Sequence, residues 1–175
     1  KLPLLTQVSV GNGILLEDIN NDRKLDILFT GNDYGTEVFN GIHDAGTGMV
    51  LLNQVNRNFK ALPPAKTHFY NEGNTRGLVK YYDVLARQFI YLTNRHGDTP
   101  ILQNAVKELD NRKLITIPKN VHRIKIQYPD GEKIVQELYI GQGYKSQNSR
   151  KIYVQGDVQR ITGTTFKGKE VIIFE

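Results

Sequence analysis

The apolar residues of this 175-residue chain come in short runs or alternate with polar residues, and Gly, Asn, Asp and Pro separate the runs. Apolar residues at a spacing of three and four, which an amphipathic helix needs, are scarce. Short alternating segments between turn residues are typical of antiparallel strands, so the sequence predicts an all-β protein. A helical turn is expected only within 103–109. The expected strands cover 13–18, 25–31, 48–54, 76–83, 88–94, 99–104, 112–117, 122–128, 132–140, 150–154, 158–163 and 170–175.

A weak internal repeat runs through the first part of the chain. The stretch LLEDINNDRKLDILFTGN, followed by MVLLNQ, resembles VKYYDVLARQFIYLTN, followed by PILQNA. In this alignment Asp18 corresponds to Asp83, and Asn53 corresponds to Asn104. A period of about 60 residues built from about four strands is the size of a propeller blade. A chance likeness between short hairpins is the alternative interpretation.

The repeat predicts two propeller-blade-like four-stranded repeats within 1–110, the second one degenerate. A small antiparallel β module is expected to follow at 111–175, where a Pro-Asp-Gly turn at 129–131 separates two alternating segments. Two blades cannot close a propeller, which needs at least about four. The chain, which begins at Lys1 rather than at methionine, is therefore expected to be the C-terminal part of a larger protein.

The first hairpin contains an unusual concentration of acidic residues. Asp18, Asn20, Asp22 and Asp26 fall within nine residues between two apolar runs. Carboxylates this close repel one another unless a turn, water or a cation satisfies them. The second copy of the repeat lacks the acidic loop, so a hairpin of this kind does not need the carboxylates. We therefore expect them to serve a purpose beyond the turn.

The spacing of these side chains suits calcium. This ion takes six to eight oxygen ligands from a flexible loop, whereas magnesium keeps several waters and zinc prefers His or Cys. The predicted ligands of a structural Ca²⁺ are Asp18, Asn20, Asp22, Lys24 through its carbonyl, and Asp26. Glycine commonly follows the third ligand in such loops, but Arg23 stands there. A metal-free acidic turn with Arg23 or Lys24 as counter-ion is the alternative.

Composition limits the other function classes. The chain has no cysteine, which excludes disulfides and thiolate metal sites, and no apolar run near the about 20 residues of a membrane helix. Residues 1–111 carry 11 Lys/Arg and 12 Asp/Glu, whereas 112–175 carry 12 and 6. The cations of this basic part are scattered singly along expected strands, without the interleaved aromatics of a stacking platform. This pattern favours a solvated sheet face and argues against nucleic-acid binding.

Catalytic signals are few. The four histidines lie far apart in the sequence, and phosphate loops, dinucleotide fingerprints and Gly-x-Ser-x-Gly elbows do not occur. A stretch at 33–48 is rich in glycine and forms an expected surface excursion. Its polar residues could form a binding surface, and they are equally what tight turns require: Asp33, Tyr34, Glu37, His43 and Asp44. The pair His43-Asp44 is more consistent with a turn than with a catalytic dyad.

Two stretches resemble known families. DINNDRKLD matches the Asp-x-Asn-x-Asp-x-x-x-Asp pattern of the FG-GAP/VCBS repeats of integrin-like β-propellers. VHRIKIQYPDGEKIVQELYIGQG resembles the ASPIC/UnbV domain that often follows these repeats, as in the cartilage acidic protein family. The chain departs from the pattern at Arg23, in its degenerate second repeat, and at Tyr128, where the family often has tryptophan.

The resemblance implies a calcium-stabilised interaction module without catalytic activity, located extracellularly or on the bacterial cell envelope. Its partner would be a surface protein or a glycan, bound in adhesion or recognition, and the ligand-binding residues stay open. A carbohydrate-active enzyme or its accessory domain is the alternative, and a cleft with two opposed carboxylates would favour it.

Overall fold

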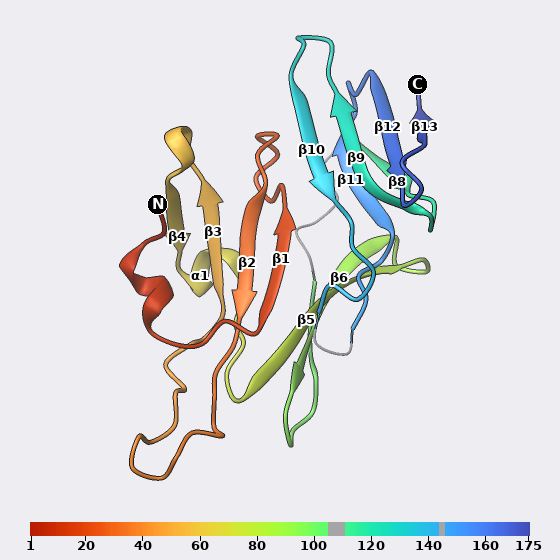
Figure 1. Ribbon diagram of the computed structural model, residues 1–175. Coiled ribbons are helices and arrows are strands. Elements are labelled where there is room, and N and C mark those ends of the chain that lie inside the picture. Colours follow the sequence, from red (N-terminus) through yellow and green to blue (C-terminus); the bar gives the residue numbers. More distant parts are fainter. Residues whose placement is uncertain (105–110, 144–145) are drawn as a thin grey trace.

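Antiparallel strands are the main secondary structure of the chain, seen in a computed structural model that describes residues 1–104, 111–143 and 146–175 (Figure 1). The helices within these ranges are short: η1 (Leu4–Gln7), η2 (Val55–Arg57) and α1 (Pro64–Thr67). The predicted all-β class is therefore confirmed. Within the same ranges no helix is long or apolar enough to cross a membrane. Most of the helical turn expected within 103–109 falls outside the described residues.

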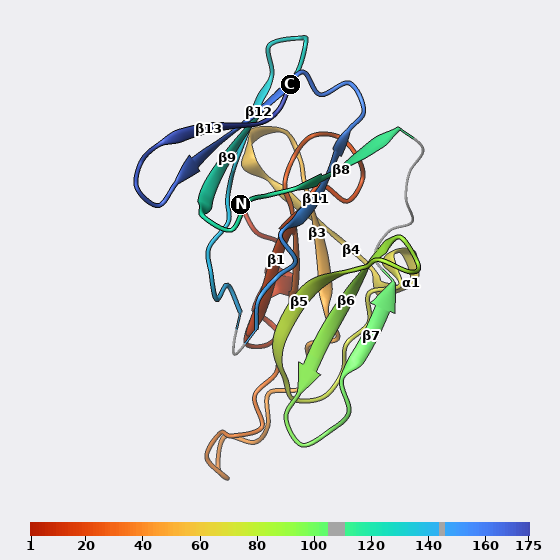
Figure 2. The same ribbon diagram turned by 90° about the vertical axis from the view of Figure 1, so that its right-hand side faces the viewer.

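The first sheet contains four strands in the order of the chain. These are β1 (Gly13–Glu17), β2 (Asp26–Thr30), β3 (Met49–Asn53) and β4 (Phe59–Leu62). Glu17 pairs with Asp26, so the hairpin between β1 and β2 closes around the acidic loop. Between β2 and β3 the segment 33–48, orange in both views, extends away from the sheets (Figures 1 and 2).

The second sheet has three strands, although the repeat predicts four. They are β5 (Thr75–Asp83), β6 (Gln88–Arg95) and β7 (Ile101–Asn104). The next strand along the chain, β8 (Arg112–Thr116), pairs instead with β11 (Lys151–Gln155) of the C-terminal part. The described part of the predicted second repeat therefore contains three paired strands, and β8 lies beyond the predicted end of that repeat at residue 110.

The remaining strands form a sheet in the order β10-β9-β12-β13. Its members are β9 (Val121–Gln127), β10 (Lys133–Glu137), β12 (Arg160–Thr165) and β13 (Glu170–Phe174). The turn between β9 and β10 is the expected Pro-Asp-Gly sequence, in which Gly131 has a φ of +86°. Figure 2 shows these strands above the sheet β5-β6-β7.

Two apolar clusters form the core. One lies in the C-terminal part and includes Ile124 and Ile161, both fully buried. The other joins the first two sheets and includes Leu15 and Phe89, with Leu114 and Tyr153 of the C-terminal part packed against it. Because the C-terminal strands share this second cluster, the division into 1–110 and 111–175 stays a prediction.

Candidate functional site

The acidic loop follows β1 directly, and its first aspartate organises the turn. One oxygen of the Asp18 carboxylate accepts the Asp22 N–H at 3.0 Å, and the other accepts the Arg23 N–H at 2.9 Å. A single carboxylate therefore binds two successive backbone amides across the loop, as aspartate commonly does in turns. The second hairpin uses a smaller version of this arrangement, since Asp83 accepts the N–H groups of Leu85 and Ala86.

Asp26 closes the other end of the loop from a fully buried position at the start of β2. Its two oxygens accept the Ile19 N–H at 2.9 Å and the Asn53 N–H at 2.8 Å. The Asn53 side-chain amide in turn donates to the Leu25 carbonyl at 3.1 Å. The loop is thus joined to β3 as well as to the strands that it connects.

The middle of the loop contains the remaining predicted ligands. The Asn20 side-chain oxygen accepts the Asp22 N–H at 3.3 Å. The Asp22 carboxylate accepts the Lys24 N–H at 3.0 Å and the Lys24 ammonium at 3.1 Å. Lys24, predicted as a ligand through its carbonyl, therefore places its side chain where the metal-free alternative expects a counter-ion.

The electrostatics of the loop follow from burial and crowding. Burial raises the pKa of Asp18 above its usual range, against the opposing effect of the Arg23 and Asp22 N–H groups. Burial also raises the pKa of Asp26, and the negative charges of Asp22 and Asp18 add to this effect. At Asp22 burial acts in the same direction, but the backbone and ammonium of Lys24 hold the pKa below its usual range. The aspartates are thus close enough to repel one another.

The donor set matches calcium in kind. The loop offers carboxylate, amide and carbonyl oxygens, and a carboxylate oxygen that accepts one hydrogen bond keeps a further lone pair. In the described part of the chain, however, no group of three or more His, Cys, Asp or Glu side chains is placed to hold a metal ion. The calcium site stays a prediction, since N–H groups and the Lys24 ammonium satisfy the carboxylates here.

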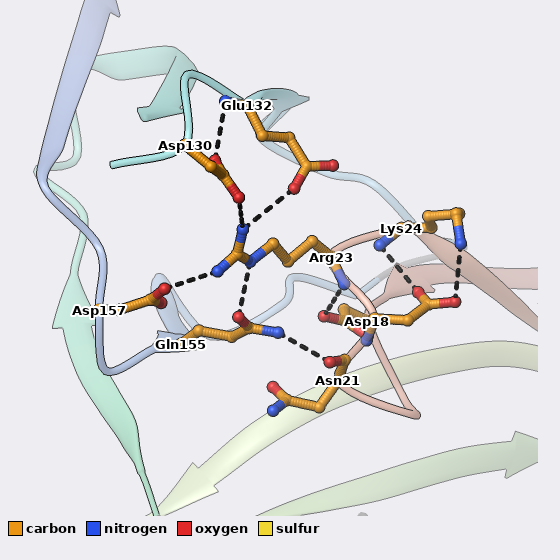
Figure 3. A network of polar contacts seen from close by, with 9 residues as sticks. Asp18, Asn21, Arg23, Lys24, Asp130, Glu132, Gln155 and Asp157 are labelled. Carbon is orange, nitrogen blue, oxygen red and sulfur yellow. Dashed lines mark hydrogen bonds and ion pairs between the residues drawn. The ribbon is translucent and has the colours of Figure 1, made fainter. Parts of the chain in front are cut away.

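Arg23 has a backbone conformation that usually favours glycine, with a φ of +64°. For a residue other than glycine this conformation costs about 1–2 kcal/mol. Its guanidinium reaches the C-terminal part, where one terminal nitrogen lies 2.5 Å from Asp130 and 3.3 Å from Glu132. The other terminal nitrogen lies 2.6 Å from Asp157 (Figure 3). One arginine therefore meets three carboxylates of the C-terminal part.

Two further contacts complete this arrangement. The Arg23 Nε donates to the Gln155 side-chain oxygen at 2.6 Å, and the guanidinium carbon lies 4.1 Å from the centre of the Tyr128 ring. We call the contacts of Arg23 with Tyr128, Asp130, Glu132, Gln155 and Asp157 the Arg23 latch.

The latch has support from neighbouring contacts. Gln155 donates its side-chain amide to the Asn21 carbonyl at 2.7 Å (Figure 3). Arg112, at the start of β8, donates to the Asn21 side-chain oxygen at 3.1 Å and to the Asp18 carbonyl at 3.3 Å. The acidic loop is therefore an interface with the C-terminal part as well as a candidate metal site.

Sequence reasoning did not find this interface. The sequence interpretation treated Arg23 as a departure from glycine or as a counter-ion within its own loop, and Tyr128 as a departure from tryptophan. The available signal was the combination of a long cationic side chain at a turn position with two acids, Asp130 and Glu132, in the turn of a distant hairpin. Nothing in the sequence pairs the two turns, because the residues are more than 100 positions apart.

The excursion at 33–48 is anchored by polar contacts. Asp33 and His43 exchange two backbone hydrogen bonds of 2.8 Å, and Arg76 forms an ion pair of 2.9 Å with Asp33. Its tip is apolar, since Phe39 is 98 % exposed and Val38 is also exposed. Of the polar surface expected there, Asp33 and His43 are thus used within the loop.

The structure assigns the histidines to separate places in the fold. His43 belongs to the bridge with Asp33, His68 ends α1 in a left-handed conformation, and the His122 ring stacks on Phe166 at 5.3 Å between centroids. The His96 N–H donates to the Asn74 carbonyl at 2.9 Å.

Comparison with known proteins adds no relative. No family model matches the chain, and no curated protein matches its sequence.

Proposed function

We propose that this chain is a non-catalytic interaction module in which the acidic loop binds calcium and holds the C-terminal part in place. The observation that carries the proposal is the set of groups that the loop contacts. Its side chains bind its own backbone, the backbone of β3 and, through the Arg23 latch, the C-terminal part. Such contacts support a structural role for a bound ion, because they shape the protein rather than expose a reactive centre.

In this proposal calcium is held by the oxygens of Asp18, Asn20, Asp22, Lys24 (its carbonyl) and Asp26. The ion supplies positive charge that offsets the repulsion among the three carboxylates. The Lys24 ammonium then no longer needs to neutralise Asp22. An ion that binds the folded loop but not the unfolded chain stabilises the fold by mass action.

We further propose that the first two sheets are related to propeller blades and that residues 111–175 form an ASPIC/UnbV-like module. The four-stranded meander of the first sheet supports this. So does the close approach of β1 to β5, where a Cβ added to Gly13 would lie 2.6 Å from the Cβ of Leu78. The proposal places the chain in the C-terminal part of a larger extracellular or envelope protein that recognises a surface protein or a glycan.

Thermal melting with excess calcium and with a chelator tests the metal part of the proposal. Calcium at about 100 times its Kd should raise the free energy of unfolding by about 2.7 kcal/mol. Asp22→Ala should remove this difference, whereas Asp44→Ala, at an exposed position of the excursion, should keep it. Coinciding melting curves of the unsubstituted chain in calcium and in chelator would contradict a calcium site.

A glycan array, read together with a broad hydrolase screen, tests the absence of catalysis. Retention of a glycan or a surface protein without turnover is the expected result. Turnover of any glycan at a rate proportional to the concentration of folded protein would contradict this proposal and favour the alternative, a carbohydrate-active enzyme.

A further inference from the structure

A cleft of about 460 Å³ lies between the first sheet and the C-terminal part. Strand β1 forms one wall, and the chain from Val135 to Tyr139 and from Gln147 to Ile152 forms much of the rest. This volume is within the range of about 300–1,000 Å³ that is usual for ligand sites. The cleft is separate from the predicted calcium ligands, none of which lines it.

Edge strands form two of its walls. β1 is the first strand of its sheet, and β10 is the first strand of the sheet β10-β9-β12-β13. Edge strands present backbone donors and acceptors to any further extended chain. The cleft therefore suits an occupant that can pair with a strand.

The direction of the β10 backbone groups follows from its hairpin. The Tyr128 N–H donates to the Glu132 carbonyl and the Leu138 N–H to the His122 carbonyl, so even-numbered residues of β10 bond with β9. Backbone groups alternate in direction along an antiparallel pair. Those of Val135 and Glu137 consequently point away from β9, toward the open edge.

Apolar side chains surround this open edge. Ile14 is 58 % exposed and Val135 is 47 % exposed, and both line the cleft together with Leu16 and Tyr139. Exposed edges are normally protected by charged residues or proline, and apolar residues at an edge are suited to pairing with another chain. Alternate side chains of an extended segment would find an apolar surface here.

The charge of the cleft is also uneven. Glu17 is neutralised by Lys80 at 3.0 Å, and Glu137 lies 3.6 Å from Arg123. Arg150 and Lys151 also line the cleft, and neither forms an ion pair with a carboxylate among the described residues. The Lys151 ammonium, however, lies 4.5 Å from the centre of the Tyr82 ring, outside the cleft, so Arg150 is the remaining cation.

Arg150 donates to the carbonyls of Pro118, Val121 and Leu138, while its Nε has no partner within the described chain. Burial lowers its pKa, in keeping with a cation that lacks a counter-ion. A negative charge on the occupant would complement Arg150.

We propose that the cleft binds an extended peptide segment of a partner protein, apolar at alternating positions and carrying a carboxylate. The peptide pairs with the open edge at Val135 and Glu137, packs its apolar side chains on Ile14 and Leu16, and directs its carboxylate toward Arg150. Strand addition of this kind draws affinity from main-chain hydrogen bonds and specificity from alternate side chains. The inference rests on the proposed interaction function and narrows its partner to a protein.

Selection of a displayed random heptapeptide library on the full 175-residue chain tests the inference. Enriched peptides should alternate apolar residues and contain Asp or Glu. Their Kd, measured by fluorescence anisotropy, should rise at least tenfold for Val135→Pro, because proline removes the outward N–H without disturbing the pairing with β9. Changing the peptide's acid to its amide should weaken binding severalfold.

Glu170→Pro is the matched control. Glu170 is an exposed residue of β13, at the opposite edge of the same sheet. The Thr165 N–H donates to the Lys169 carbonyl in a hairpin of the same form, and Glu170 pairs with Thr164 in its regular part, before the irregularity between Ile161 and Thr162, so the backbone groups of Glu170 point outward. Circular dichroism and melting should show both proline variants folded, and Glu170→Pro should leave the Kd unchanged.

The outcomes separate this inference from the proposed function. A library without enriched peptides, equal affinity of Val135→Pro and the unsubstituted chain, or equal loss in both proline variants would overturn the peptide cleft. Binding of glycans alone would also overturn it, while leaving the interaction module in place. Turnover of a bound peptide or glycan would instead overturn the non-catalytic function itself.

Discussion

The guanidinium of Arg23 lies over the ring of Tyr128, with 4.1 Å between its central carbon and the ring centroid. The first residue belongs to the acidic loop, and the second follows β9 of the C-terminal part. A cation over an aromatic ring contributes about 0.5–1 kcal/mol at exposed sites and more when water is excluded. With the ion pairs around it, this contact makes the conformation of the acidic loop matter for the docking of the C-terminal strands.

Arg23→Gly should therefore have two opposed effects. It removes the strain of a positive φ, which favours the variant by about 1 kcal/mol, and it removes every side-chain contact of the latch. We expect amide hydrogen exchange in 18–24 and 128–132 to become faster even where global stability changes little. Hydrogen exchange followed by mass spectrometry measures this.

Arg87→Gly is the control for the strain. Arg87 also lies in a hairpin turn, with a φ of +51°, and its side chain forms no ion pair within the described residues. This variant should gain stability without faster exchange in either segment. Slower or unchanged exchange at 128–132 in Arg23→Gly would contradict a latch between the two parts.

Asp26→Ala should destabilise the fold markedly. Asp26 is fully buried and accepts the N–H groups of Ile19 and Asn53, which alanine would leave without partners. Each buried donor left unsatisfied costs about 1–3 kcal/mol, so the two together should lower the free energy of unfolding, measured in urea, by about 2–6 kcal/mol. Asp44→Ala, at an exposed position, should change stability by less than about 0.5 kcal/mol. A loss at Asp26 no larger than at Asp44 would show that these hydrogen bonds do not hold the loop.

Acid should weaken the latch. The Glu132 N–H and the Arg23 guanidinium hold the pKa of Asp130 below its ordinary value of 3.8. A carboxyl whose pKa is lower in the folded than in the unfolded chain contributes stability above the unfolded value, and this is lost as pH falls through the folded one. As the pH is lowered below about 4, the free energy of unfolding should fall less steeply in Asp130→Asn than in the unsubstituted chain. If the free energy of unfolding fell equally steeply with acid in both proteins, the protonation of Asp130 would not be what weakens the latch.

Gly13→Ala should disturb the packing of the first two sheets. An added Cβ would lie 2.6 Å from the Cβ and 2.7 Å from the backbone nitrogen of Leu78, so a strand has to move. Overpacking of this kind typically costs about 1–3 kcal/mol. Gly11→Ala is the comparison, because its Cβ would meet only the Phe29 ring at 3.8 Å. The two melting temperatures, measured side by side, should differ by several degrees, and equal values would count against the close approach of β1 and β5.

Local signals in the sequence were enough for the fold class and for several turns. Alternating apolar residues predicted the β-strands, and Pro129-Asp130-Gly131 predicted the turn between β9 and β10, where Gly131 has the positive φ that glycine allows. The acidic loop was correctly expected in the bend between two strands, whereas its calcium stays a prediction. These features depend on residues a few positions apart, so a single stretch of sequence contains the information.

Tertiary structure decided the rest. The second sheet has three strands in the described chain, β8 pairs with the distant strand β11, and Arg23 forms a contact between two parts of the chain rather than a defect of one turn. The cleft between β1 and β10 likewise exists only because two sheet edges come together. Each of these outcomes joins residues far apart in the sequence, where partners are selected by packing and charge in three dimensions and the local pattern contains no information about them.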